Sequence, residues 1–146
     1  MIKSISYMNM KESDKLFERL RSIKLENIEM LQEIEVLCKN IDDTNIIEPL
    51  FFVFENNPNF DFGNPGNLIR IVEKFYLSPI YEEELYKSVK RKPTEYNLWM
   101  INRLLNTFSE EKKLKGIELF KKIIDNPAIS KEIRDTAQVF LDEQTE

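Results

Sequence analysis

Apolar residues recur with the period of an α-helix along most of this chain of 146 residues. In the clearest example, the spacing places six apolar side chains on one face of a helix: Met30, Leu31, Ile34, Leu37, Cys38 and Ile41. Only three glycines occur, which is few for the many tight turns of a β-sandwich or β-barrel. The sequence therefore predicts an all-α protein.

Prolines and helix-capping residues divide the chain into about eight helices, and most of these fall into pairs. Two acidic N-terminal helices are expected within 12–41, and one helical pair within each of 44–77, 79–108 and 110–142. Helical pairs with a period of roughly 30–40 residues are typical of HEAT-like repeat proteins. We therefore expect a single domain over 1–146, built as a short α-solenoid. An irregular helical bundle is the alternative.

Local ambiguities surround the third expected helix. Pro49 either kinks that helix or lies at its start behind a Glu48 cap. The five apolar residues at 50–54 suit a buried strand as well as a helix. The loop at 56–66 is dense in turn-forming residues, and we expect its phenylalanines to anchor it while Asp61 points outward or caps a nearby backbone group.

The side chains needed for most enzyme chemistry are missing or isolated. There is no histidine, which removes the commonest general base and most zinc-ligand sets. Cys38 is the only cysteine and lies on an apolar helix face, so we interpret it as a core residue. No glycine-rich phosphate loop occurs, and no two acids are singled out as a catalytic pair. We therefore expect no enzymatic activity, no cofactor and no metal site.

The distribution of apolar and cysteine residues also bears on location. The longest apolar run is far shorter than the roughly 20 residues of a membrane span. The N-terminus lacks the apolar segment of a secretory signal, and a lone cysteine suits a reducing compartment. We expect a cytoplasmic protein without a membrane partner.

Negative charge is concentrated in one part of the chain. Residues 26–61 contain nine acids and one base, within a chain of net charge −5. Such a segment repels nucleic acid and attracts a basic protein. Glu26, Glu29 and Glu33 share one flank of the helix expected at 28–41, where they form either a solvated face or a contact for a basic partner.

The helix expected at 94–108 carries the second candidate binding face. With its apolar residues turned inward, four other side chains gather on one side: Trp99, Asn102, Arg103 and Asn106. Tryptophan and arginine are enriched among the residues that dominate binding energy at protein interfaces. The alternative is that Trp99 packs in the core.

Three strings of this sequence resemble a family of small, helical, HEAT-like bacterial proteins associated with immunity to polymorphic or contact-dependent toxins. They are FENNPNFDFGNPGNLIRIVEKF (54–75), YEEELYKSVKRKPTEYNLWMINRLLN (81–106) and DNPAISKEIRDTAQVFL (125–141). The resemblance spans roughly 44–142 and carries over Glu55, Asp61, Gly63, Pro65, Gly66, Glu73 and the four residues of the Trp99 face. Arg70 lies one turn before Glu73, so those two residues are candidates for a structural ion pair.

The resemblance implies an immunity protein that binds and neutralises a toxin domain made by its own cell. An acidic inhibitor suits a cationic toxin, such as a nuclease, and the expected surface joins 26–61 to the Trp99 and Arg103 face. The alternative is a helical-repeat scaffold that bridges two cellular proteins and has no toxin partner. The sequence does not indicate an oligomeric state.

Overall fold

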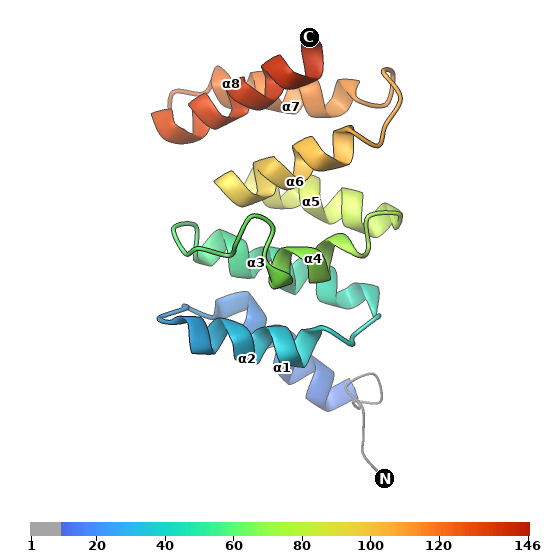
Figure 1. Ribbon diagram of the computed structural model, residues 1–146, viewed down its shortest axis with the longest axis vertical. Coiled ribbons are helices and arrows are strands. Elements are labelled where there is room, and N and C mark those ends of the chain that lie inside the picture. The colour runs from blue at the N-terminus through green and yellow to red at the C-terminus, as the bar shows by residue number, and fades with distance from the viewer. Residues whose placement is uncertain (1–9) are drawn as a thin grey trace. The chain divides into compact units, whose positions relative to one another are not determined.

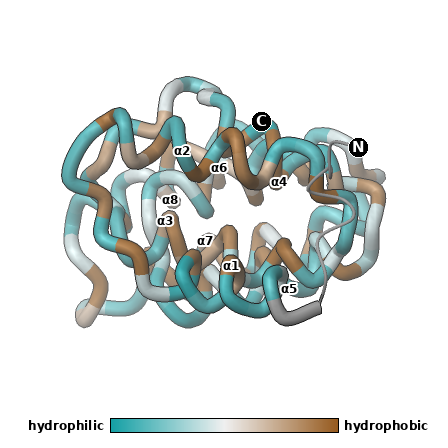
Figure 2. Tube along the Cα trace, turned by 90° about the horizontal axis from the view of Figure 1, so that it is seen from below, coloured by the Kyte–Doolittle hydropathy of each residue, from teal (hydrophilic) through white to brown (hydrophobic). Residues whose placement is uncertain are grey.

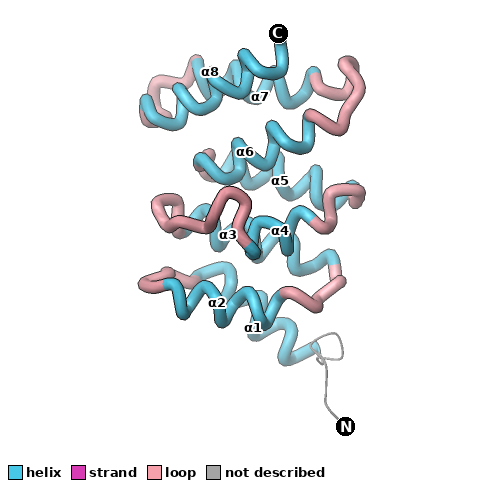
Figure 3. Tube along the Cα trace, in the orientation of Figure 1, coloured by secondary structure: helices cyan, strands magenta, loops and turns pink. Residues whose placement is uncertain are grey.

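The computed structural model describes residues 10–146, and within that range the chain forms helices and loops but no strand. The helices are α1 (Met10–Ser22), α2 (Ile28–Cys38), a short 3-10 helix η2 (Thr44–Ile46), α3 (Ile47–Asn56), α4 (Asn67–Glu73), α5 (Pro79–Arg91), α6 (Glu95–Leu105), α7 (Leu114–Ile124) and α8 (Lys131–Thr145) (Figure 1, Figure 3). The all-α prediction is confirmed, and the segment 50–54 is helical. In the described part of the chain, no helix is both long and apolar enough to cross a bilayer.

The chain divides into two compact units, one ending at Glu84 and the other beginning at Leu85, so the boundary falls within α5. In the first unit, α1 packs against α3 and α2 packs against α4. In the second, α8 packs against both α7 and α6. The predictions of a single domain and of an α-solenoid, with the irregular bundle as its alternative, depend on how these two units are arranged. They therefore stay predictions.

Each unit has its own apolar core. Hydrophobic and hydrophilic residues alternate along the helices in short runs, as expected of helices that bury one face (Figure 2). In the first unit, Leu20, Ile34 and Leu50 have no exposed surface, and the rings of Phe51 and Tyr81 lie 5.8 Å apart between centroids. Full burial of one such side chain contributes about 1.5–3 kcal/mol.

The start of α3 differs from the predicted cap. Pro49 is the third residue of α3, where the backbone N–H has no acceptor within the helix, so its missing hydrogen costs nothing. Glu48 lies inside the helix and is not its cap. The chain instead enters through η2, whose cap Asp43 accepts a hydrogen bond from the Asn45 amide at 2.9 Å.

A buried asparagine joins the end of α3 to the connection between α1 and α2. The Asn57 carboxamide donates to the carbonyl oxygens of Ile23 (2.9 Å) and Val53 (2.8 Å). Its Oδ1 accepts from the Leu25 amide at 2.7 Å. These bonds satisfy backbone groups that helix ends leave unpaired, and they fix the position of α1 relative to α3.

The following loop is anchored as expected. Phe62 is buried with its ring centroid 4.7 Å from that of Phe54, and Asp61 accepts a hydrogen bond from the Gly63 amide at 2.9 Å. Gly63 has φ +90°, a left-handed conformation that favours glycine. A Cβ at Gly66 would lie 1.6 Å from the Phe62 carbonyl oxygen, so only glycine fits there.

In the second unit, a reciprocal capping box starts α6. Thr94 Oγ1 accepts from the Asn97 amide at 3.1 Å, and Asn97 Oδ1 accepts from the Thr94 amide at 2.7 Å. The Asn97 amide group also donates to Ser88 and to the Lys92 carbonyl, which holds the end of α5 against α6. The predicted cap Ser130 accepts from the Ile133 amide and begins α8.

The sequence predicts a helix capped by Ser109 that turns four apolar residues inward: Leu114, Ile117, Phe120 and Ile124. The helix α7 differs from this prediction, because it begins only at Leu114, which is 58% exposed. The residues that α7 buries are Gly116, Leu119, Phe120 and Ile123. A Cβ at Gly116 would lie 2.6 Å from a methyl of Leu105, so the glycine permits the close approach of α7 to α6.

Candidate functional site

A cavity of about 470 Å³ opens on the first unit between α1, η2, α3 and the beginning of α5. We call it the acidic pocket, because four carboxylates and one guanidinium supply its charged side chains. Those residues are Asp14 and Arg21 from α1, Asp43 before η2, Glu48 from α3 and Glu84 from α5. The excess of carboxylates distinguishes this cavity from an anion-binding site.

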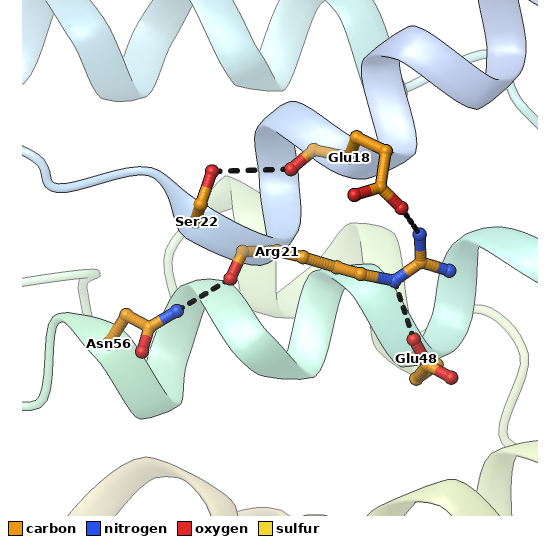
Figure 4. Close-up of polar contacts among 5 residues, drawn as sticks. All are labelled: Glu18, Arg21, Ser22, Glu48 and Asn56. Carbon is orange, nitrogen blue, oxygen red and sulfur yellow. Dashed lines mark hydrogen bonds and ion pairs between the residues drawn. The ribbon is translucent and has the colours of Figure 1, made fainter.

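Among the described residues that line the acidic pocket, the only cation is already engaged. Arg21 Nε donates to Glu48 Oε1 at 2.7 Å, and the same guanidinium donates to Glu18 (Figure 4). These contacts, chiefly the hydrogen bond to Glu48, raise the pKa of Arg21 above its ordinary value. The Arg21 carbonyl accepts from Asn56 at 2.8 Å, which further fixes the end of α1 on α3.

Two other carboxylates of the pocket, those of Asp14 and Asp43, are accessible. Asp14 is exposed and has no hydrogen bond or ion pair with any residue that the structure describes. Asp43 is exposed and uses one oxygen to cap η2. Phe17, which is buried, and Ile80, which is 41% exposed, add apolar surface to the lining. A lysine or arginine side chain, with an aliphatic stem and a cationic head, matches this combination.

The acids predicted on α2 are at the surface, as expected of either a solvated face or a contact. Glu26, Glu29 and Glu33 are all exposed, and Glu26 precedes the helix, whose cap is Asn27. Glu33 accepts from Arg19 of α1 at 3.0 Å, so one of the three carboxylates has a cationic neighbour within the chain.

Three further acids came from the family resemblance, and the structure places them differently. Glu55 is only 4% exposed and has interactions within the chain, because α3 is buried on nearly every side. Its burial does not favour a contact between Glu55 and a partner, which stays a prediction. Asp61 is exposed in the loop, and Glu73 is half-buried at the end of α4 and engaged within the chain. The expected ion pair between Arg70 and Glu73 does not form: the Arg70 guanidinium has no partner among residues 10–146.

In the second unit, Trp99 is half-buried and Arg103 is exposed. The Arg103 guanidinium carbon lies 5.3 Å from the centroid of the indole ring, a cation–π contact. This contact holds the two side chains together on the surface of α6. Trp99 therefore belongs neither to the core nor to a fully exposed face.

The asparagines of the same face serve largely to hold α8. Asn102 is 5% exposed, donates to Glu143 at 2.8 Å and accepts from Gln144 at 2.7 Å. The Asn102 side chain is thus used inside the unit, and its contact with a partner stays a prediction. Asn106 accepts from Gln144 at 2.9 Å but remains exposed.

The contacts made by Glu143 and Gln144 were difficult to predict from the sequence. The apolar face of the last helix ends at Leu141, so the following polar residues resemble a solvated tail, but α8 continues to Thr145. The only signal is the presence of two asparagines one turn apart on α6, which offer amide groups to a neighbouring polar side chain.

The predicted surface is distributed over the two units. The acids lie in the first unit, and the Trp99 face lies in the second. A single surface joining them stays a prediction. No family model, no curated protein and no solved structure matches this chain.

Proposed function

We propose that this chain is an immunity protein that binds and neutralises a cationic toxin domain made by the same cell. The observation that carries this proposal is the acidic pocket of the first unit. Its single guanidinium is engaged by Glu48 and Glu18, while Asp14 has no partner among the described residues. The pocket thus has surplus negative charge for a basic side chain of the partner.

The wider charge distribution supports a basic partner. The chain has a net charge of −5, and the exposed acids on and beside α2 belong to the same unit as the pocket. Charge of this sign accelerates the encounter with a cationic protein. A toxin that acts on nucleic acid uses its cationic surface to hold phosphates, so an acidic inhibitor would compete directly for that surface.

The first test is complex formation with the toxin domain encoded by the adjacent gene. Co-expression should yield a complex that survives gel filtration, and the chain should protect cells that express the toxin domain. If the neighbouring gene encodes no toxin, or if its product neither binds nor is inhibited, the proposal is wrong and the scaffold alternative gains support.

The second test asks whether the acidic pocket is the binding site. The Asp14→Lys substitution should weaken the complex by about tenfold or more, equivalent to about 1.4 kcal/mol, because it places a cation at the mouth of the pocket. Asp125→Lys is the matched control: Asp125 is an exposed acid after α7, likewise without a partner among the described residues. Equal losses from both substitutions would indicate general electrostatic attraction and would exclude the pocket as the specific contact.

A further inference from the structure

We propose that the groove between α2 and α4 binds an amphipathic helix of another protein, one that carries acidic residues along one edge. This inference does not rest on the proposed function, because the groove shares no residue with the acidic pocket and its free charge has the opposite sign. It would give the chain a second protein-binding surface within the same unit.

The groove has a volume of about 630 Å³ and is lined by two helices. From α2 it receives Gln32, Glu35 and Val36, and from α4 it receives Asn67, Arg70 and Ile71. Lys39 and Lys74, the C-caps of these two helices, complete the lining. In each segment the lining residues follow the spacing i, i+3, i+4, i+7, so they lie on one helical face. Two packed helices with an apolar strip between them form the type of groove that accepts an amphipathic helix.

Polar contacts hold the groove in shape at both ends. Near the start of α4, Glu35 Oε2 accepts from the Leu68 amide at 3.1 Å. Near its end, Lys74 Nζ donates to the Lys39 carbonyl at 3.2 Å and lies 3.3 Å from an Asp42 carboxylate oxygen. These contacts tie α2 to α4, so a ligand would not have to order the two helices on binding.

Between these two links, apolar surface remains uncovered. Val36 is 57% exposed on α2, and Ile71 forms part of the floor with 8% of its surface exposed. A single exposed valine is ordinary on a protein surface. Here it borders a preformed groove, where an apolar side chain from a partner helix could contact both Val36 and Ile71.

The unpaired cations of the groove indicate that the partner helix is acidic along one edge. The Arg70 guanidinium and the Lys39 ammonium group have no hydrogen bond or ion pair with any described residue, and both line the groove. Arginine binds carboxylates through paired hydrogen bonds, so an acidic residue of the partner would bind at Arg70. Glu29 and Glu33, exposed on α2, would repel acids on that side. The acidic edge of the partner helix should therefore face α4.

The probe is a pair of synthetic, fluorescein-labelled helical peptides of about 15 residues, long enough to cover α2. Both have a leucine face; one carries glutamate along one edge, and the other carries lysine at the same positions. The glutamate peptide should bind at least about tenfold more tightly, as judged by fluorescence anisotropy. Its amide chemical-shift changes in the labelled protein should map to α2 and α4.

Variants of exposed residues then locate the site. Val36→Asp should weaken glutamate-peptide binding by about tenfold or more, because it replaces an apolar contact by a carboxylate that repels the acidic peptide. Val139→Asp is the matched control, since Val139 is a 54% exposed valine on α8, and it should leave binding unchanged. Arg70→Glu should reverse the preference in favour of the lysine peptide. Thermal melts establish that each variant is folded.

Several outcomes would overturn the inference. They are equal affinity for the two peptides, no binding of a panel of acidic amphipathic peptides, and equal losses from Val36→Asp and Val139→Asp. Analytical sedimentation of the full chain tests whether a second copy of the chain occupies the groove instead of another protein. A dimer that dissociates in Val36→Asp but not in Val139→Asp would assign the groove to self-association instead.

Discussion

Arg21 of α1 and Glu48 of α3 are joined by a hydrogen bond of 2.7 Å between Nε and Oε1 (Figure 4). The two residues are far apart in sequence, so the bond fixes one helix on another rather than one turn of a helix on the next. The same guanidinium also binds Glu18. Both members of the pair are only partly exposed, which reduces the screening of their attraction by water.

A double-mutant cycle should detect this pair. Arg21→Ala, Glu48→Ala and the double variant should give a coupling free energy of about 0.5–1 kcal/mol in urea unfolding, at the upper end of the range for ion pairs near the surface. The control is the same cycle on Lys131 and Asp135 of α8. Their ion pair has the same N–O distance, 2.7 Å, but both side chains are largely exposed. This control cycle should give about 0.3–0.5 kcal/mol. A coupling at Arg21 no larger than in the control would show that the link between α1 and α3 adds nothing.

Glu35 should make the stability of the protein depend on pH. Burial raises the pKa of Glu35 above its ordinary value of 4.5, and hydrogen bonds from the Leu68 amide and the Asn67 side chain oppose this rise. The folded state thus binds this proton more tightly than the unfolded state does. The contribution of Glu35 to stability is therefore present below its ordinary pKa and is lost as the pH rises through the raised value.

The Glu35→Gln variant isolates this effect, because glutamine keeps an acceptor for the Leu68 amide but does not titrate. The free energy of unfolding of the wild type minus that of the variant should fall between about pH 4 and about pH 7. Urea unfolding at the two pH values measures the difference. A difference that stays constant, or that rises with pH, would contradict the assigned direction.

Sequence periodicity predicted the helices well where one apolar face is broad. Most of the stripe from Met30 to Ile41 became α2, but that helix ends at Cys38, three residues before the stripe does. Periodicity failed at α7, because Leu114 marks the first turn of that helix and the inward face is set by the close contact of Gly116 with Leu105. Spacing within one helix carries no information about such a contact with another.

The candidate site was less predictable than the helices. The exposure of Glu29 and Glu33 follows from their place on one flank of α2, and Glu26 is exposed just before that helix begins. The burial of Glu55 and Asn102 depends on neighbours that are distant in sequence. The acidic pocket likewise depends on packing, because its carboxylates come from four separate segments and meet only when α1 packs against α3.

Glu26, Glu29 and Glu33 carry like charges that repel one another, yet together they should be slightly stabilising. Glu33 has an ion pair with Arg19, and Glu29 lies in the first turn of α2, where the helix dipole favours negative charge. Replacing Glu26, Glu29 and Glu33 together by glutamine should lower stability by about 0.5–1 kcal/mol in dilute buffer. Calorimetry should show a smaller difference at about 0.5 M salt, where screening is strong. A higher melting temperature for the variant in dilute buffer would restore the repulsion argument.

The thiol of Cys38 should be unreactive toward thiol reagents in the folded protein. Its side chain has no exposed surface, and burial raises the pKa of its thiol to about 12, despite the opposing influence of Lys74 and Arg19. Because the thiolate is the reactive form, labelling by a thiol reagent at about pH 8 should be slow without denaturant and complete in urea. Rapid labelling of the native protein would indicate local opening of α2.

Trp99 should behave as a half-buried residue that is partly covered by Arg103. Its contact with the guanidinium lies at the surface of α6, so Trp99→Ala should cost about 1–3 kcal/mol of stability. A fully buried aromatic residue would cost about 3–5 kcal/mol. Urea unfolding measures the cost, and Trp99 is the only tryptophan, so its fluorescence reports on this site alone.

The effect of the charge of Arg103 can be separated from its coverage of the Trp99 indole by two substitutions, Arg103→Lys and Arg103→Ala. Lysine keeps the charge but lacks the planar group that lies over the indole, and alanine removes both. Quenching of Trp99 fluorescence by neutral acrylamide should therefore increase from the wild type to Arg103→Lys and again to Arg103→Ala. The free energy of unfolding should fall by no more than about 1 kcal/mol in either variant. Quenching that is already complete in the wild type would mean that the cation–π contact does not persist in solution. Emission that is fully protected in all three proteins would place Trp99 in the core and exclude it from any binding surface.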